Sequence, residues 1–126
     1  MRTKGLILSK LGHTWIFDID GTLVKHNGYK IEGCDTLLTG VKEFLNSIPE
    51  KDMIIFLTSR KEEYKEQTIN FFQSSGIRYD HIIFNAPCGE RILINDCKPS
   101  GLEMSVAVNV VRDADWVIDV KEDPTK

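Results

Sequence analysis

The chain has few cysteines, and their spacing gives them no evident shared role. Only three of its 126 residues are cysteine, and no Cys-x-x-Cys or Cys/His ligand spacing occurs. An odd number of isolated cysteines favours neither a disulfide framework nor a zinc site. We therefore expect Cys34, Cys88 and Cys97 to be reduced thiols.

Long apolar runs are also missing. No segment approaches the roughly eighteen consecutive apolar residues that a membrane-spanning helix requires. The apolar stretch 5–8 near the start is too short for the core of a signal peptide. These absences predict a cytoplasmic protein with no membrane partner.

Positive charge is not in excess. The 16 Lys and Arg residues are outnumbered by 19 Asp and Glu, and the net charge is -3 at pH 7. Such a balance gives no general attraction to polyanions, so nucleic acid is not an expected partner. The sequence has no repeat and no Pro/Ser-rich linker, and its length predicts one domain over 1–126. Only the charged tail 121–126 is expected to fray.

The sequence contains an alternation of apolar runs and amphipathic segments. Five short apolar, β-prone runs predict strands. They lie at 13–17, 53–57, 81–84, 92–94 and 106–108, the last running toward Val111.

Two helices are predicted between these strands. Apolar residues at i, i+3, i+4 and i+7 predict a helix over 40–48 that Pro49 closes, and a second is expected over 61–75, ended by Gly76. Strands that are apolar on both faces and joined by helices indicate an α/β fold, a Rossmann-like three-layer sandwich around a central parallel sheet. Ligands bind such sheets beyond the carboxyl ends of the strands. The polar groups at 18–22, 58–60 and 95–98 are therefore the candidate site.

Asp18 and Asp20 form the most informative of these groups. They flank one residue at the end of an apolar run, and Gly21 and Thr22 follow at once. A solvated turn is an alternative interpretation of Asp-x-Asp-Gly. A calcium loop is another, but apolar residues at 23–24 interrupt the regular oxygen ligands that such a loop needs.

This part of the chain resembles a known family. The run 15–24, Trp-Ile-Phe-Asp-Ile-Asp-Gly-Thr-Leu-Val, is similar to the first motif of the haloacid dehalogenase superfamily of phosphotransferases. Residues 54–60, an apolar run that ends at Thr58, resemble the second motif, and 92–96, which end in Asn95 and Asp96, resemble the fourth. The three motifs occur in the family's order and lie within residues 14–98. The resemblance implies a HAD-like phosphatase domain.

The family's chemistry would give the acidic residues distinct roles. The resemblance implies a magnesium-dependent phosphomonoester hydrolase in which Asp18 attacks phosphorus and becomes an aspartyl phosphate. Asp20 would protonate the leaving alcohol and then activate water. The Mg²⁺ ion would be held by Asp18, the carbonyl of Asp20, and Asp96, which are the oxygen ligands it prefers. Asn95, neutral where many relatives carry an acid, would reach the metal only through water.

Phosphate-binding residues are less clearly marked. Thr58 and Ser59 follow a predicted strand and precede a helix, where hydroxyl and amide groups can hold a phosphate oxygen; a simple helix cap is the other role open to Thr58. The resemblance also implies one Lys or Arg that neutralises phosphate. Lys98 is favoured and Arg91 comes next, and a solvated surface role stays open for both.

The sequence leaves no room for a cap domain. Segments 22–53 and 58–96 accommodate only short elements, so the resemblance implies a capless member. Such a site is open to water and bulky substrates, or a neighbouring subunit covers it in a homo-oligomer. Within the flap 25–30, Lys25 and His26 can contact the organic part of a substrate. A solvated turn at Asn27-Gly28 is the alternative.

The substrate class rests on a narrower resemblance. The run 95–101 is similar to that of small capless hydrolases associated with sugar phosphates and surface polysaccharide synthesis. A sugar phosphate or a similar small phosphorylated metabolite is therefore the expected substrate. Two other classes stay open: a phosphatase of a macromolecular phosphate, and a non-catalytic module that binds phosphorylated ligands on the same fold.

Overall fold

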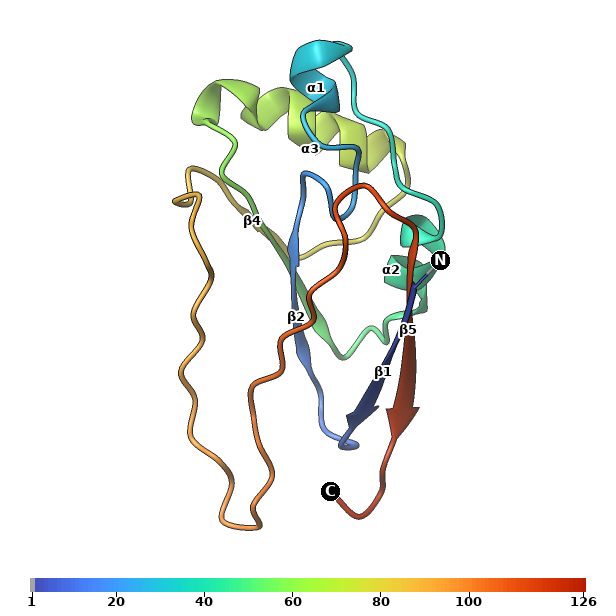
Figure 1. Ribbon diagram of the computed structural model, residues 1–126, viewed down its shortest axis with the longest axis vertical. Helices are drawn as coiled ribbons and strands as arrows, with labels where there is room; N and C mark the ends of the chain where they lie inside the picture. Colours follow the sequence, from blue (N-terminus) through green and yellow to red (C-terminus); the bar gives the residue numbers. More distant parts are fainter. Residues whose placement is uncertain (1) are drawn as a thin grey trace.

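Two small parallel sheets and a set of short helices make up the fold. The computed structural model describes residues 2–126. The elements in chain order are β1 (Arg2–Leu8), β2 (Thr14–Asp18), α1 (Gly28–Ile31), α2 (Val41–Ser47), β3 (Met53–Leu57), the 3-10 helix η1 (Glu62–Tyr64), α3 (Lys65–Ser74), β4 (His81–Ile83) and β5 (Trp116–Glu122). One sheet has the order β2-β3-β4, and the other pairs β1 with β5 (Figure 1). The predicted α/β class with parallel strand pairing is thus confirmed, but the strands form two small sheets where one central sheet was predicted.

The three-stranded sheet forms where the sequence predicts strands. The predicted strands at 13–17, 53–57 and 81–84 correspond to β2, β3 and β4, within one residue at each end. Asp18 lies beside Leu57, and Leu57 lies beside Ile83. The carboxyl ends of the three strands therefore meet at one edge of the sheet, as the sequence interpretation requires.

One face of this sheet packs against two helices. The ring of Phe17 lies 6.3 Å from that of Phe44 on α2, and the ring of Phe56 lies 4.9 Å from that of Phe72 on α3. Burying one such side chain contributes about 1.5–3 kcal/mol. This layer therefore fixes β2 and β3, whereas Ile16 on the opposite face of the sheet is exposed.

Both predicted helices are present. The helix expected at 40–48 is α2, which ends before Pro49, and the one expected at 61–75 is η1 followed by α3. Gly76, with a φ of 71°, ends the second helix in the left-handed conformation that favours glycine. Within residues 2–126, no helix has the length and apolar character needed to cross a membrane.

The sequence patterns do not predict β1 or β5. These strands join the two ends of the chain in register, from Arg2 beside Trp116 to Leu8 beside Glu122. The expected frayed tail at 121–126 is therefore wrong for its first two residues, which belong to β5. The amide of Asp123 also donates to the carbonyl of Leu8 at 2.8 Å.

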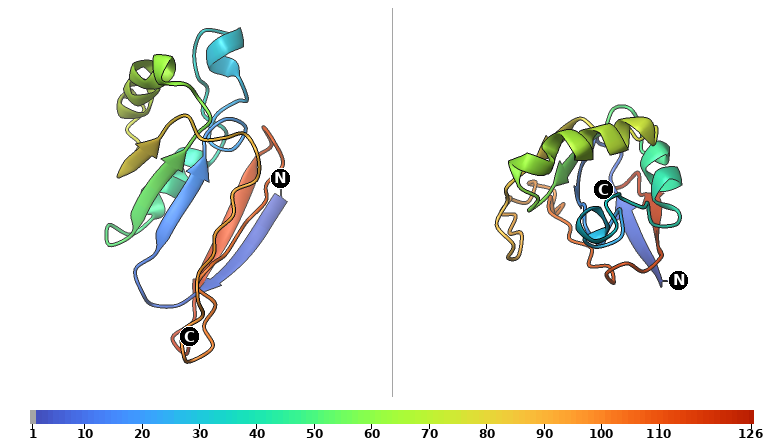
Figure 2. Two further views of the ribbon diagram at one scale, coloured as in Figure 1. Left: turned by 90° about the vertical axis from the view of Figure 1, so that its left-hand side faces the viewer. Right: turned by 90° about the horizontal axis from the view of Figure 1, so that it is seen from above.

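The strands predicted at 92–94 and 106–108 are wrong. Residues 86–111 form an excursion without helix or strand. It leaves the carboxyl end of β4, descends to the opposite end of the molecule and returns toward β5, as the ochre and orange trace shows (Figures 1 and 2). Ile92 and Ile94 are 83% and 91% exposed. Residues 92–94 and 106–108 have the composition of strands. However, the backbone hydrogen bonds within 88–110 are those of the turn at 98–102, so neither segment pairs with a neighbouring strand.

Candidate functional site

The turn after β2 is anchored by buried apolar residues. The amide of Leu23 donates to the carbonyl of Ile19 at 2.9 Å, and both side chains are fully buried. Gly21 has a φ of 85°, where a side chain would be strained. The anchored turn holds Asp18 and Asp20 close to the polar edge of the sheet, as predicted from the Asp-x-Asp-Gly run.

Asp18 is a half-buried carboxylate with two polar neighbours. The hydroxyl of Thr22 donates to its Oδ2 at 3.0 Å, and Nη1 of Arg91 lies 3.5 Å from its Oδ1. Burial raises the pKa of Asp18 above the ordinary 3.8, against the effects of the Thr22 hydrogen bond and the Arg91 charge. One side of this carboxylate remains accessible to a ligand, since the side chain keeps 37% of its exposure.

Asp20 is held by a guanidinium rather than by solvent. Nε of Arg60 donates to its Oδ2 at 3.0 Å, and Nη2 donates to its Oδ1 at 2.9 Å. This is the paired geometry in which arginine recognises a carboxylate most specifically. Asp20 remains 16% exposed while the side chain of Arg60 is 1% exposed, so Asp20 lies at the boundary between the buried cluster and solvent.

The same guanidinium binds a second carboxylate. Arg60 donates to both oxygens of Asp35, at 3.0 and 2.7 Å. Burial acts to lower the pKa of Arg60, but the hydrogen bonds to Asp35 and Asp20 outweigh it and raise the pKa above its ordinary value. Arg60 therefore stays charged. The sequence places Arg60 in the polar group 58–60 but predicts no role for it, and it does not mark Asp35, because no local spacing identifies partners that far apart in the chain.

Thr58 is buried directly after β3. Its amide donates to the carbonyl of Ile83 at 2.9 Å, and its hydroxyl accepts the amide of Arg60 at 3.1 Å. Thr58 precedes the helical segment that begins with η1, as predicted, but the alternative role of helix cap is wrong, because Lys61 is the N-cap of that segment. Ser59 donates its hydroxyl to the carbonyl of Pro87 at 3.3 Å. Thr58 thus shapes the turn that carries Arg60.

The structure separates the two predicted phosphate-neutralising residues. Arg91 contacts Asp18, whereas Lys98 is exposed and lies in the turn at 98–102. That turn is at the end of the molecule opposite the carboxyl end of β2 (Figure 1). Arg91, the second choice from sequence, is therefore the one brought to Asp18, because the excursion passes the sheet edge before it descends.

Asp96 and Asn95 are not brought to Asp18 either. Both are exposed in the descending part of the excursion, and Nδ2 of Asn95 donates to Oδ1 of Asp96 at 3.3 Å. Within residues 2–126, no group of three or more His, Cys, Asp or Glu side chains is arranged to hold a metal. Asp18 and the backbone of Asp20 fit Mg²⁺ in donor type, because they supply hard oxygen ligands from one turn. Asp96 does not complete that set in this arrangement.

A third arginine, Arg112, lies against the turn after β2. A Cβ built on Gly21 would come within 3.0 Å of its Cγ, and the amide of the next residue, Asp113, donates to the carbonyl of Gly21 at 2.9 Å. Trp116 also donates its indole N–H to the carbonyl of Thr22 at 2.8 Å. The segment before β5 thus brings a cation to the site that no sequence motif marked.

Two polar contacts and a short helix fix the conformation of the flap. Lys25 forms an ion pair with Glu32 at 2.7 Å, and the amide of His26 donates to Oδ1 of Asp113 at 2.7 Å. Asn27, with a φ of 56°, leads into the short helix α1. The suggested contacts of Lys25 and His26 with a substrate stay a prediction. The alternative prediction of a simple turn at Asn27-Gly28 is incomplete, because Gly28 begins the short helix α1.

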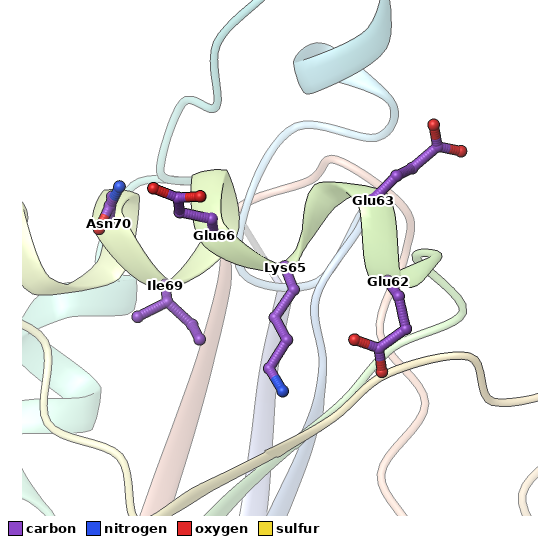
Figure 3. Close-up of a pocket in the computed structure, with 6 residues that line it drawn as sticks. All are labelled: Glu62, Glu63, Lys65, Glu66, Ile69 and Asn70. Carbon is purple, nitrogen blue, oxygen red and sulfur yellow. The ribbon is translucent and has the colours of Figure 1, made fainter.

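A shallow depression of about 400 Å³ lies along η1 and α3, and Asp18 and Asp20 are not among its lining residues. Figure 3 shows three glutamates and one lysine among its lining residues. Such an acidic lining would repel a phosphate. All three cysteines are free and exposed, and none lines this depression.

Comparison of the chain with protein-family models, with curated proteins and with solved structures finds no match.

Proposed function

We propose that the protein is a phosphomonoester hydrolase that acts through an aspartyl phosphate on Asp18, with Asp20 as general acid and base. The observation that carries the proposal is the pair of carboxylates on one anchored turn at the carboxyl end of β2, with Arg91 3.5 Å from Asp18. A carboxylate with one accessible side and a neighbouring cation is suited to attack a bound phosphate. The resemblance of residues 15–24 to a phosphotransferase motif supports the same chemistry.

The reaction has two displacement steps. A carboxylate oxygen of Asp18 attacks phosphorus, the bond from phosphorus to the ester oxygen breaks, and the proton of Asp20 passes to the departing alcohol. Water then attacks phosphorus, Asp20 takes one of its protons, and the bond between phosphorus and Asp18 breaks. Phosphate leaves, and both carboxylates return to their starting states.

The proposal includes Mg²⁺ as cofactor. Asp18 and the carbonyl of Asp20 would bind it, and Asp96 would join them only if the descending part of the excursion moved toward β2. When bound, the ion offsets the repulsion between the phosphate dianion and the attacking carboxylate. The proposal also includes the three-layer, HAD-like arrangement. Its third layer would cover the face of the β2-β3-β4 sheet on which Ile16 is exposed.

The proposed substrate is a sugar phosphate or a similar small phosphorylated metabolite. Support comes from the resemblance of 95–101 to small capless hydrolases and from the shortness of segments 22–53 and 58–96, which leaves no room for a cap domain. A homo-oligomer that covers the open site belongs to this proposal. Specificity would then come from the flap and from Arg112, which lies beside Gly21.

The decisive experiment is a screen of phosphorylated metabolites in which inorganic phosphate release is measured with and without magnesium. Each active compound is retested with an Asp18→Asn variant and with Asp119→Asn, a matched change on the exposed part of β5. Release that requires Asp18 but not Asp119 supports the proposal. Binding of the compounds without phosphate release would favour the non-catalytic module, and activity on phosphorylated polymers alone would favour a macromolecular substrate.

A further inference from the structure

Arg60 uses every hydrogen-bond donor that it has. A guanidinium carries five N–H groups. Two donate to Asp20, two to Asp35 and one to the hydroxyl of Thr68, at distances of 2.7 to 3.0 Å. The hydroxyl of Thr68 in turn donates to the carbonyl of Tyr64 at 2.7 Å. A cation this fully bound has one defined orientation, and it imposes that orientation on its partners.

Two further contacts to Arg60 come from the flap and from the residues that follow it. Tyr29, in the flap, places its ring centroid 3.9 Å from the guanidinium carbon, the geometry of a cation–π contact. Tyr29 is itself buried and packs edge-on against Tyr64 at 4.8 Å. Asp35 lies beyond the flap, between α1 and α2. The flap is therefore attached to Arg60 through Tyr29, and the segment after it through Asp35.

The second carboxylate lets Arg60 keep a counter-ion while Asp20 acts. If Asp20 were the only counter-ion, its loss of negative charge would leave the buried Arg60 charge unpaired, which is strongly unfavourable. Asp35 already neutralises that charge with two hydrogen bonds. Arg60 therefore stays in place beside Asp20 while Asp20 exchanges a proton in the proposed reaction.

We infer that Arg60 is a positioning residue for Asp20, and that Asp35 and Tyr29 hold Arg60 so that the flap sets the orientation of the general acid. The inference rests on the proposed function, since it assigns a role within that reaction. Arg60 would thus connect the flap, which is expected to contact the organic part of the substrate, with Asp20, which protonates the leaving oxygen.

The test compares Arg60→Lys with the wild type on p-nitrophenyl phosphate, whose leaving group needs little protonation, and on glycerol phosphate, whose leaving group needs much. Lysine keeps the charge but loses the planar fork that binds both carboxylates. We expect kcat on glycerol phosphate to fall about 10- to 100-fold with KM nearly unchanged, because misplacement of a catalytic group by about 1 Å costs that much. The loss on the aryl ester should be smaller.

A double variant makes the test specific. If Arg60 acts only through Asp20, then Asp20→Asn combined with Arg60→Lys should be no slower than Asp20→Asn alone, on each ester that the wild type turns over. Losses that multiply, or equal losses of Arg60→Lys on both esters, would overturn the inference. Asp35→Asn preserves side-chain shape and serves as a second variant if Arg60→Lys folds poorly; it should shift the ester ratio in the same direction.

Arg78→Lys is the matched control. Arg78 donates to the carbonyls of Ile48 and Pro49 at the amino end of the strands, so its replacement should leave the ratio of the two ester rates unchanged. A wild type that releases phosphate neither in the metabolite screen nor from the two esters overturns the proposed function and the inference together. A wild type that is active, with an ester ratio indifferent to Arg60 and Asp35, overturns the inference alone.

Discussion

Arg91 lies with its Nη1 3.5 Å from Oδ1 of Asp18, although the two residues belong to distant parts of the chain. Asp18 ends β2, while Arg91 belongs to the excursion that follows β4. A phosphate that approached Asp18 would therefore meet a positive charge beside the attacking oxygen. This contact distinguishes Arg91 from Lys98, which lies at the far turn of the excursion.

Arg91→Ala should weaken substrate use far more than Lys98→Ala. A hydrogen bond to a charged group contributes about 1.5–3 kcal/mol, so kcat/KM should fall about 10- to 100-fold, mainly through KM. Initial rates over a range of substrate concentrations measure the change. Lys98→Ala removes the same charge from the opposite end of the molecule and is the control. A larger loss with Lys98→Ala would mean that the excursion rearranges to bring Lys98 to the phosphate.

Asp18→Asn should abolish turnover and leave the fold intact. An amide does not attack phosphorus, and the Asn side chain can still accept the hydrogen bond from Thr22. Phosphate release and the circular dichroism melting curve, measured on the same preparation, separate loss of chemistry from loss of structure. Retained turnover in a pure variant would rule out the covalent mechanism on Asp18.

Strands with uninterrupted apolar runs were predictable, and strands that depend on the chain's two ends were not. β2 and β3 follow from Thr14–Asp18 and Met53–Leu57, whose composition leaves little alternative. β5 carries Asp119 and Lys121 among its apolar residues, and its partner β1 lies at the other end of the sequence. Only long-range pairing identifies these strands. The exposed run 92–94 shows the converse, since propensity without a partner makes no strand.

The candidate site likewise contains residues that local sequence predicts and residues that only tertiary contacts bring together. Asp18, Asp20 and Thr58 lie at strand ends and were found from local sequence. Arg60 belongs to the polar group 58–60, but its role was not predicted, because its carboxylate partners are 25 and 40 residues away along the chain. Arg112 reaches the turn through the return of the excursion toward β5, which no spacing rule encodes. Residues that act through tertiary contact therefore have no signature in a single sequence.

Chelation should stop the reaction, and added magnesium should restore it. The reason is that phosphate and the carboxylate of Asp18 repel each other unless a cation lies between them. Activity is measured after treatment with EDTA and again after addition of excess Mg²⁺. Calcium should not restore the rate, because its larger and looser coordination shell misaligns the reacting groups. Full activity after exhaustive chelation would contradict a magnesium requirement.

Asp52→Asn should destabilise the protein in a pH-dependent way. Asp52 is buried and accepts the indole N–H of Trp15 and the amide of His13, both at 3.0 Å. Burial opposes its charge, but the hydrogen bonds outweigh burial and lower the pKa of Asp52 below the ordinary 3.8. A lowered carboxyl pKa contributes stability that is present above the unfolded value and is lost as pH falls through the folded value.

Asp52→Asn should therefore lower the free energy of unfolding by about 1–3 kcal/mol near neutral pH, since one of the two N–H donors loses its acceptor. The gap in melting temperature between wild type and variant should be constant above about pH 5 and should narrow below pH 3.8. Thermal melts at several pH values give the comparison, with Asp119→Asn as an exposed control. A gap that stays unchanged at low pH would mean that the Asp52 charge contributes nothing to folding.

Asp20→Asn should show a defect that depends on the leaving group. Asp18 and Arg91 remain, so an aspartyl phosphate should still form from an activated aryl phosphate, whose oxygen departs without a proton. With an alkyl phosphate, both leaving-group protonation and water activation suffer, and the rate should fall by about 10² to 10⁴. Steady-state rates on the two ester types, in wild type and Asp20→Asn, measure the difference.

The Asn amide keeps the size of the Asp20 side chain beside Arg60 and Asp35, which limits structural disturbance of that cluster. An equal loss on both esters would mean that Asp20 serves only as a structural partner of Arg60. A selective loss on the alkyl ester would identify it as the acid that the proposed reaction requires.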